Sequence, residues 1–472
     1  MAGIVAYGTY LPYWRLDRKA IAAALGAPSG RGARAVASFD EDTTSMGVEA
    51  ARVALRAAPE SVAPELVLFA TAAPAYLDKT NATAVHAALG LPESVGAYDM
   101  VGSVRSAMGA MRLAATSAQP SLVVLSDVRT GRPGSGDERD GGDAAAAFLL
   151  AEGDVLVEVL GRASSTHEFL DRWRVPGDAY SHVWEERFGE TVYVPSAETA
   201  VTDAMKRAGI TAEAIDHLIV TGVHARAARA VAAGVGARRE AAVDDLTSTV
   251  GNTGTAHGGL LLAAVLDRAE PGQVIVLVQL ADGADAVVLR TTEALSRYRQ
   301  RRATTVEAQI ASGRPDLPYP SFLTWRGELT REPPRRPDPD SPAAPPSMRD
   351  ERWKFGFAGS RCEVCGTRHL PPARVCVKCH AVDQMSRERM ADVPATIATF
   401  TVDRLAYSLA PPVVAAVIDF DGGGRLRCEL TDVDPANVKI GDRVIMSFRR
   451  LYTAGTGVHD YFWKARPIKE SD

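Results

Sequence analysis

The first 292 residues alternate short apolar runs with longer segments that have apolar residues at helical spacing. A short apolar run bounded by glycine or polar residues is typical of a buried strand, and the helical spacing predicts the helices between them. We expect strands at Gly3–Thr9, Leu66–Ala70, Ala97–Met100, Leu122–Ser126, Ala144–Leu150, Leu218–Thr221 and Val274–Gln279.

Polar and glycine residues at helix boundaries indicate where several helices begin and end. Asp17 precedes a short helix that ends near Gly26, and either Asp42 or Thr43 opens a longer one. Gly90 is a typical C-terminal residue for a third helix. Further helices are predicted over SVRSAMGAMRLAA, ARAARAVAAG and LLLAAVLDRA.

The order of helix, strand and turn occurs twice. The first copy runs to the segment GGDAAAAFLL, around Asp143, and the second copy runs to DGADAVVLRT, around Asp285. Because apolar strands must be covered on both faces, two such copies predict a duplicated, layered α/β domain. Between them, Ser164–Glu190 is aromatic and charged, and insertions of this kind often shape the mouth of a pocket.

The pattern changes after residue 292. A charged helix is expected over Glu293–Ser312, and the proline-rich Glu332–Pro346 is expected to be an extended linker. Later, short strand-like runs predict a small β-barrel, namely ATIATFTV, VVAAVIDF, RLRCEL and RVIMSFRRL. We therefore divide the chain into residues 1–292, 293–349, 350–384 and 385–472.

Composition narrows the functional classes. A net charge of −5 over 472 residues gives no electrostatic footprint for nucleic acid or an acidic membrane. The N-terminal MAGIVAYGTYLPYWRL lacks the features of a signal peptide, and no segment approaches the roughly 20 apolar residues that span a bilayer. We expect a soluble, cytoplasmic protein that binds neither nucleic acid nor membranes.

Four of the five cysteines form one C-x2-C-x10-C-x2-C motif: Cys362, Cys365, Cys376 and Cys379. Two such pairs can hold Zn²⁺ with Zn–S distances of about 2.3 Å, and four protein ligands indicate a structural site. The alternatives are a redox pair or reduced thiols without metal. His369 and His380 are surplus to a four-ligand site, and Cys428 falls in a strand pattern that favours the core.

Several segments carry a resemblance to known families: GIVAYGTYLP, DEDTTSMGVEAARVAL, SDVRTGRPG, GNTG and AAVLDRAEPGQVIVL. On these segments, Ala2–Thr292 resembles 3-hydroxy-3-methylglutaryl-CoA synthase of the archaeal and bacterial type, and more distantly ketoacyl-ACP synthase III. The cysteine motif followed by a barrel resembles the rubredoxin-like zinc-ribbon/OB-fold domain that accompanies thiolase-superfamily enzymes and helps to hold acyl-CoA. The resemblance implies a five-layer αβαβα fold, a coenzyme A thioester as substrate or ligand, and a homodimer.

The resemblance also implies a cysteine nucleophile, a general-base glutamate, a histidine and an asparagine. The nucleophile position, where AYDM meets the next helix, is Val104, and the glutamate position is Ala72. The histidine position matches Thr221, with His224 three residues later. Only the asparagine matches directly, as Asn252.

No residue from Met1 to Arg361 is a cysteine, so another alignment cannot restore a thiolate nucleophile. The remaining candidates are Ser103 as a nucleophile, His224 and His257 as acid–base groups, and Asn252 as a polar pocket residue. Three of them also have a structural interpretation. Ser103 suits a tight strand–helix junction, His224 suits a loop or the surface, and Asn252 suits a turn.

Two basic features have both functional and structural interpretations. Arg105 could bind an acidic group or pair with a carboxylate such as Asp99. The loop over residues 128–143 could contact a phosphate or a partner subunit, or could be a charged solvated loop.

These observations favour an acyl-CoA-binding protein in carbon–carbon bond formation or cleavage that supports a separate, intact thiolase. The alternative is an autonomous cysteine-independent acyltransferase or a retro-aldol lyase acting on acyl-CoA. A genuine condensing synthase is less well supported because the thiol is missing, and nucleic-acid binding by the barrel is a more distant possibility.

Overall fold

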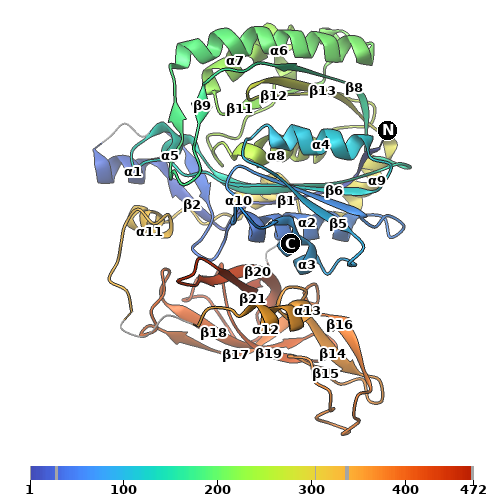
Figure 1. Cartoon of the computed structure of the whole chain (residues 1–472), viewed down its shortest axis with the longest axis vertical. Helices are drawn as coiled ribbons and strands as arrows, with labels where there is room; N and C mark the ends of the chain where they lie inside the picture. The colour runs from blue at the N-terminus through green and yellow to red at the C-terminus, as the bar shows by residue number, and fades with distance from the viewer. Residues whose placement is uncertain (1, 27–29, 303, 335–339, 469–472) are drawn as a thin grey trace. The chain divides into compact units, whose positions relative to one another are not determined.

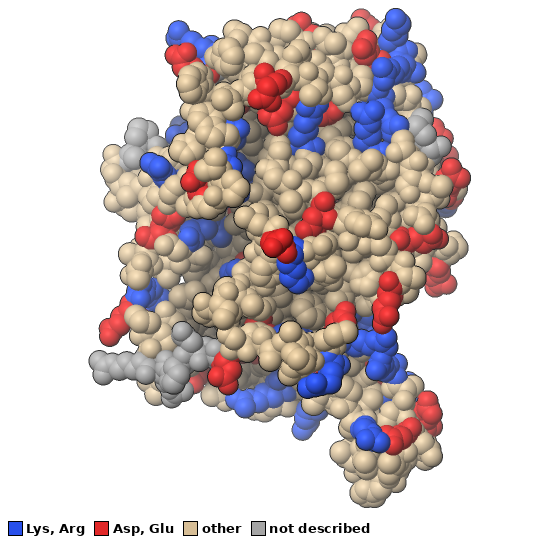
Figure 2. All heavy atoms as spheres, in the orientation of Figure 1, with Lys and Arg blue, Asp and Glu red and all other residues tan. Residues whose placement is uncertain are grey.

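The computed structural model describes residues 2–26, 30–302, 304–334 and 340–468 (Figure 1). The chain divides into two compact units. The first comprises Met1–Ala37, Asp42–Ala82 and Glu93–Phe322, and the second comprises Ser38–Glu41, Thr83–Pro92 and Leu323–Asp472. Within the described part of the chain, no helix combines the length and the apolar character needed to cross a membrane. Lys and Arg are interspersed with Asp and Glu on the face in Figure 2.

The first unit is built on a nine-stranded sheet in the order β11-β12-β13-β8-β1-β7-β6-β4-β5. The strands are β1 (Gly3–Tyr10), β4 (Leu66–Thr71), β5 (Gly96–Val101), β6 (Ser121–Val128), β7 (Asp143–Ala151), β8 (Val157–Thr166), β11 (His217–Gly222), β12 (Val274–Leu280) and β13 (Gly283–Thr291). Strand β1 meets β8 at the pair Ile4↔Val157, whereas β1 and β7 pair along their length. The sheet therefore consists of two halves joined at one end.

Helices cover both halves of this sheet. Helix α2 (Thr43–Ala57) packs on β1, β6 and β7, and α4 (Ser106–Thr116) packs on β4, β5 and β6. Helix α8 (His257–Leu266) contacts β7 in one half and β11 in the other. Helices α6 (Glu186–Ala208) and α7 (Ala225–Gly234) cover the second half, so helical and sheet layers alternate in Figure 1.

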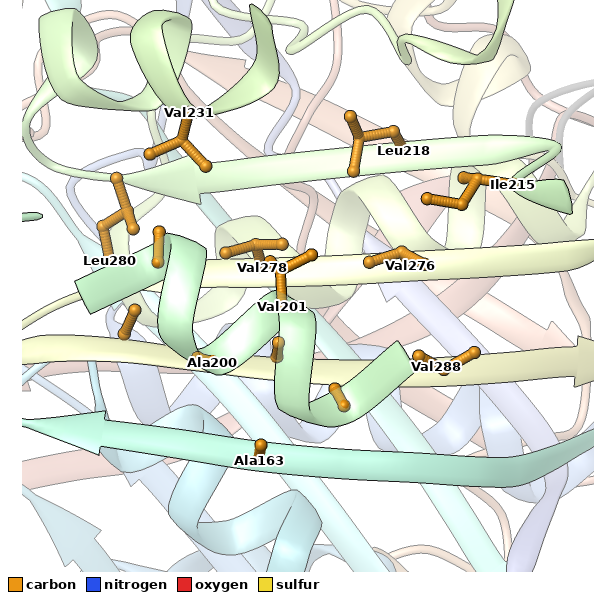
Figure 3. Close-up of a cluster of buried hydrophobic side chains, with 14 of the residues drawn as sticks. Ala163, Ala200, Val201, Ile215, Leu218, Val231, Val276, Val278, Leu280 and Val288 are labelled. Atoms are coloured by element: carbon orange, nitrogen blue, oxygen red, sulfur yellow. The ribbon is translucent and has the colours of Figure 1, made fainter. Parts of the chain in front are cut away.

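The core of the second half lies between α6, α7 and the sheet (Figure 3). Val201 of α6 lies beside Val278 of β12, Ala200 lies towards Val288 of β13, and all four side chains are buried. Alanine on the helix allows close approach to the β-branched strand residues, which supports dense packing.

The predicted helix boundaries in the N-terminal region are confirmed. Asp17 caps α1 (Arg18–Leu25) by accepting from the Lys19 N–H, and Gly26 ends it with a φ of 64°. Asp42 and Ser45 form a reciprocal capping box at the start of α2. These side chains satisfy backbone N–H groups that have no partner within the helix.

Two segments differ from the expectation. The charged helix expected over Glu293–Ser312 is two helices, α9 (Glu293–Arg301) and α10 (Val306–Ala311). The Thr305 side chain caps the second helix by accepting from the Ala308 N–H, which favours a new start there. Helix α6 had not been predicted, and it contains Pro195, which cannot donate a helical hydrogen bond.

The second unit contains a five-stranded antiparallel sheet in the order β19-β18-β17-β20-β21. Its strands are β17 (Ala395–Asp403), β18 (Val413–Phe420), β19 (Arg425–Glu429), β20 (Arg443–Thr453) and β21 (His459–Pro467). A bridge between Leu430 and Ala465 joins the two outer strands, so the sheet curls on itself. Residues 335–339 of the expected linker lie outside the described residues.

Candidate functional site

Four small apolar side chains from the two halves of the first unit meet in one cluster. Ala72, Val104 and Ala281 are buried together, with Val223 packed against them. Ala72 and Val104 come after β4 and β5, which are parallel neighbours, and Val223 and Ala281 come after the parallel pair β11 and β12. Carboxyl ends of parallel strands share one edge of a sheet, which is where ligands commonly bind in α/β folds.

Two adjoining cavities open at this edge. The smaller, of about 140 Å³, is lined by Ala72, Ser103, Val104 and neighbouring side chains. The larger, of about 990 Å³, is lined by His224, Asn252 and many charged residues. The two cavities share lining residues, which are Arg129, Arg172, Ser181 and Val223. The larger cavity has space for an extended cofactor, and the smaller one for a short acyl group.

Ser103 lines the small cavity, and no histidine among the described residues forms a hydrogen bond with it. Its hydroxyl donates to a carboxylate oxygen of Asp282 at 3.3 Å and accepts from the backbone N–H of Arg105 at 3.2 Å. Asp282 has a φ of 47°, a left-handed conformation that is uncommon for a residue with a side chain. These contacts hold the strand–helix junction, which matches the structural interpretation of Ser103.

His224 lines the large cavity from the start of α7. Its Nδ1 accepts a hydrogen bond from the Ala227 N–H at 3.0 Å, so the neutral ring carries its proton on Nε2. Asn252 lines the same cavity, but both ends of its amide contact the backbone. Its nitrogen donates to the Gly222 carbonyl at 2.8 Å and its oxygen accepts from the Gly254 N–H at 2.9 Å.

His257 and Thr221 line neither cavity. His257 is buried in α8, where its Nδ1 accepts from the Thr253 N–H at 3.3 Å. Burial lowers the pKa of His257 to about 4, although the nearby Asp245 opposes the shift, so the ring is neutral at pH 7. Thr221 is buried in β11.

Two residues that the sequence did not suggest, Asp171 and Tyr193, line the adjoining cavities, Asp171 the larger one and Tyr193 the smaller one. The Tyr193 hydroxyl donates to Oδ2 of Asp171 at 3.2 Å, and the rings of Tyr193 and His224 are 5.6 Å apart. Among the described residues, Oδ1 of Asp171 is buried without a hydrogen-bond partner. Burial and the adjacent carboxylates raise the pKa of Tyr193 well above its ordinary value, so the phenol stays protonated.

These two residues come from the aromatic insertion and from α6. Asp171 lies in Ser164–Glu190, and Tyr193 lies about two turns beyond the start of α6. The same insertion supplies Arg172 and Arg174 to the small cavity. The signal available in the sequence was the aromatic, charged composition of DRWRVPGD, which indicates a pocket mouth but not which side chains point inward.

Arg105 pairs with a carboxylate, as one of its two interpretations predicted, but the partner is not Asp99. Its Nε donates to Asp285 at 2.8 Å, and its other nitrogens contact the Asp282 carbonyl and Thr166. Asp99 instead accepts from the backbone N–H groups of Asn81 and Ala82.

The four sulfur atoms of the cysteine motif converge in the second unit, and all lie within 4.8 Å of one another. The Cys362–Cys379 and Cys365–Cys376 pairs are 3.6 and 3.5 Å apart. A tetrahedral Zn²⁺ with Zn–S near 2.3 Å needs sulfur atoms about 3.8 Å apart, so the four thiols fit this ion. The motif lies at the three-stranded sheet of β14 (Ala358–Cys362), β15 (Arg368–His369) and β16 (Met385–Arg389).

Comparison with known families finds two matches. Residues 388–449 match the family described as "ChsH2, C-terminal OB-fold domain". Residues 205–290 match "3-Oxoacyl-[acyl-carrier-protein (ACP)] synthase III C terminal".

Solved structures share the fold of the first unit at low sequence identity. The synthase PksG of Bacillus subtilis gives a TM-score of 0.60 at 18% identity, covering 69% of this chain and 88% of PksG. MvaS in complex with 3-hydroxy-3-methylglutaryl coenzyme A gives 0.57 at 22% identity, covering 72% of this chain and 94% of MvaS.

A curated relative is more similar in sequence. The hydroxymethylglutaryl-CoA synthase of Aeropyrum pernix is 32% identical over 345 residues, which cover 70% of this chain and 95% of that protein. This similarity agrees with the shared fold and the matching C-terminal domain and confirms the resemblance found in the sequence. The chain therefore belongs to the hydroxymethylglutaryl-CoA synthase family of the thiolase superfamily, and it carries a C-terminal OB-fold domain of the ChsH2 type.

Proposed function

We propose that the protein binds acyl-CoA and takes part in acyl-CoA carbon–carbon bond formation or cleavage without a thiolate nucleophile. The observation that carries this proposal is the buried cluster of Val104 and Ala72. These are the positions at which the family resemblance implies a cysteine and a glutamate. Valine cannot attack a thioester and alanine cannot accept a proton, so acyl transfer through this pair is chemically impossible.

The ligand proposal rests on the cavities and on the relatives. Among the similar structures, MvaS holds 3-hydroxy-3-methylglutaryl coenzyme A, and another synthase is complexed with CoA. The 990 Å³ cavity of this chain adjoins the small apolar cluster, as a site for a long cofactor with a short acyl group requires. Calorimetry with acetyl-CoA and with unrelated nucleotides tests this binding directly.

We further propose that the protein acts as a subunit or scaffold for a separate thiolase that supplies the missing nucleophile. Retention of the fold together with loss of the reactive pair supports this role. Purification from the native host followed by mass spectrometry should recover a cysteine-containing thiolase. Efficient condensation by the isolated chain would contradict the scaffold role.

The second candidate is a cysteine-independent acyltransferase or retro-aldol lyase. It is favoured by the polar group at the junction of the cavities, where His224 and Asp171 line one cavity and Tyr193 lines the other. In retro-aldol cleavage, a base removes the proton of a 3-hydroxyl group, the Cα–Cβ bond breaks, and the enolate is then protonated at Cα. A His224→Ala variant that retains all activity would argue against His224. A genuine condensing synthase remains the least supported possibility.

The cysteine cluster supports a structural Zn²⁺ held by Cys362, Cys365, Cys376 and Cys379. Four protein sulfurs complete a tetrahedral shell, so no position is left for substrate. The proposed organisation is a thiolase-like domain over residues 1–292, a helical and proline-rich segment over 293–349, a zinc ribbon over 350–384, and an OB-like barrel over 385–472. The layers of the first unit support its interpretation as a duplicated five-layer fold.

We also propose a homodimer that forms through β5, which is the last strand of the large sheet. Tyr98 and Val101 of this strand are 59% and 41% exposed, although both are large apolar residues. An exposed sheet edge offers backbone groups to a second copy. Replacement Tyr98→Lys should shift the sedimentation coefficient from that of a dimer towards that of a monomer, and a monomeric wild type would contradict the proposal.

A further inference from the structure

A carboxylate and a phenol form a buried pair where the two cavities adjoin. Asp171 is 4% exposed and Tyr193 is 3% exposed. The phenol donates to Oδ2 of Asp171 at 3.2 Å, and Oδ1 of Asp171 is buried with no hydrogen-bond partner among the described residues. A buried carboxylate oxygen without a partner is costly, so this oxygen is suited to accept a proton.

The hydrogen bond of this pair connects the two cavities. Tyr193 lines the cavity of about 140 Å³ together with Ala72 and Val104, and Asp171 lines the cavity of about 990 Å³. Ala72 occupies the position at which the family resemblance implies a general-base glutamate, and its side chain cannot accept a proton. The phenol of Tyr193 therefore brings a proton-transferring group to the same cavity from a different element, helix α6.

The charged side chains that line the smaller cavity are less suited to proton transfer. Asp282 is exposed, and one of its carboxylate oxygens accepts from the Ser103 hydroxyl at 3.3 Å. Arg129, Arg172 and Arg174 are cations that have no acceptor. Their positive charge instead favours the negative charge that develops on a thioester oxygen when Cα loses a proton. The cavity thus offers both a proton-transferring pair and an electrostatic environment that stabilises an enolate.

We propose that Tyr193 and Asp171 form an acid–base pair that moves a proton at Cα of the bound acyl-CoA. The inference rests on the proposed function and deepens it by assigning this step to two residues. In bond formation, the Tyr193 oxygen takes a proton from Cα while its own proton passes to Asp171, and the C–H electron pair forms the enolate. In bond cleavage, the enolate takes the Tyr193 proton at Cα, and Asp171 returns a proton to the phenol oxygen. Neither direction needs a thiolate.

The electrostatics of Tyr193 explain why the two residues must act together. Burial first of all, and then the carboxylates of Asp171 and Asp282, raises the pKa of Tyr193 well above its ordinary value. The phenol therefore stays protonated at pH 7 and does not act as a free phenolate base. Its proton can leave towards Asp171 only as the phenol oxygen gains another one, which is a concerted transfer. Asp171 lines the larger cavity, where its proton can exchange with water.

Deuterium exchange on the full-length protein tests this assignment with acetyl-CoA as the probe. The protein is incubated with acetyl-CoA in D₂O, and mass spectrometry measures deuterium in the acetyl group, which reports proton transfer at Cα without any carbon–carbon bond change. Wild-type protein should exchange these protons faster than a protein-free solution, and Asp171→Asn and Tyr193→Phe should each slow the exchange at least about 100-fold. Calorimetry should show a Kd for acetyl-CoA that changes by less than about twofold in both variants, because the pair acts in the transition state.

Tyr319→Phe is the matched control. Tyr319 is also buried and also donates to a carboxylate, that of Glu138 at 3.1 Å, but neither residue lines either cavity. This variant should exchange at the wild-type rate. Binding of acetyl-CoA to the wild type without exchange would overturn the inference but leave acyl-CoA binding intact, and exchange at the wild-type rate in Tyr193→Phe would overturn the role of the phenol. Failure of acetyl-CoA to bind would overturn the proposed function itself.

Discussion

Val104 packs beside Ala72 in one buried cluster, at the carboxyl ends of two parallel strands. The position of Val104 is further held by Gln279 of β12, whose side-chain nitrogen donates to the Val104 carbonyl at 2.5 Å. The backbone at this position is therefore supported from the other half of the unit. The backbone of the site is therefore held in place, although the side chains at positions 72 and 104 are apolar.

Restoring a thiol at this position should restore reactivity towards thioesters. Val104 lines the small cavity and lies just before α4, where the helix dipole favours a thiolate. We predict that Val104→Cys becomes acylated by acetyl-CoA at position 104 and loses at most about 1 kcal/mol of stability. Peptide mass spectrometry checks the adduct, with Ala281→Cys as the control, because Ala281 lines the same cavity but precedes strand β13 and not a helix. Equal acylation of both variants would contradict the predicted role of position 104.

Gly189 allows Asp171 and His224 to approach each other. A Cβ at this position would lie 2.7 Å from Oδ1 of Asp171 and 2.8 Å from Nε2 of His224. We predict that Gly189→Ala lowers the free energy of unfolding by about 1–3 kcal/mol, despite the higher helix propensity of alanine. Gly234→Ala, at a helical glycine with open space around it, should instead stabilise the protein slightly. Urea denaturation of both variants measures the difference, and a stabilised Gly189→Ala would contradict the crowding at this site.

His257 should make stability depend on pH. The pKa of His257 in the folded protein is about 4, below the ordinary 6.5. Its contribution to the free energy of unfolding is therefore present above pH 6.5 and is lost as pH falls towards 4. We predict a loss of about 2 kcal/mol from this residue between about pH 7.5 and about pH 5. His257→Asn retains an acceptor for the Thr253 N–H but cannot be protonated. Urea denaturation at both pH values should show a smaller loss for the variant, and parallel losses would refute the prediction.

The cysteine cluster should bind about one zinc ion per chain. Cys376 is fully buried, so Cys376→Ser should reduce the zinc content to near zero and destabilise the ribbon. Cys428→Ser serves as the control, because Cys428 lies in β19, outside the cluster, where burial raises the pKa of its thiol to about 12. Elemental analysis of the purified variants gives the result. Full zinc content in Cys376→Ser would show that this cysteine is not a ligand.

Much of the fold follows from local features of the sequence. Strands such as β6 and β12 are continuous apolar runs, and α2 begins at a capping box that is visible in the residues themselves. The sequence does not predict helix α6 because it contains Pro195 and because its apolar residues do not form one stripe. Tertiary packing against β8 and β13 stabilises this helix where local propensity does not.

The site was only partly predictable for a similar reason. Ala72 and Val104 were placed together because they match positions of a known fold, and the structure brings them into contact. Asp171 and Arg174 lie in an insertion without regular periodicity, so the sequence does not show which side chains point inward. Their positions depend on long-range contacts, such as the hydrogen bond from Tyr193 to Asp171.

The most direct test of a nucleophile-free site is intact-protein and peptide mass spectrometry after incubation with acetyl-CoA and acetoacetyl-CoA. The account predicts that residues 1–322 of the wild-type protein carry no acyl group, although both esters bind. The same incubation with an intact thiolase is the positive control. An acyl adduct on Ser103, or on any other side chain that lines the small cavity, would contradict the account.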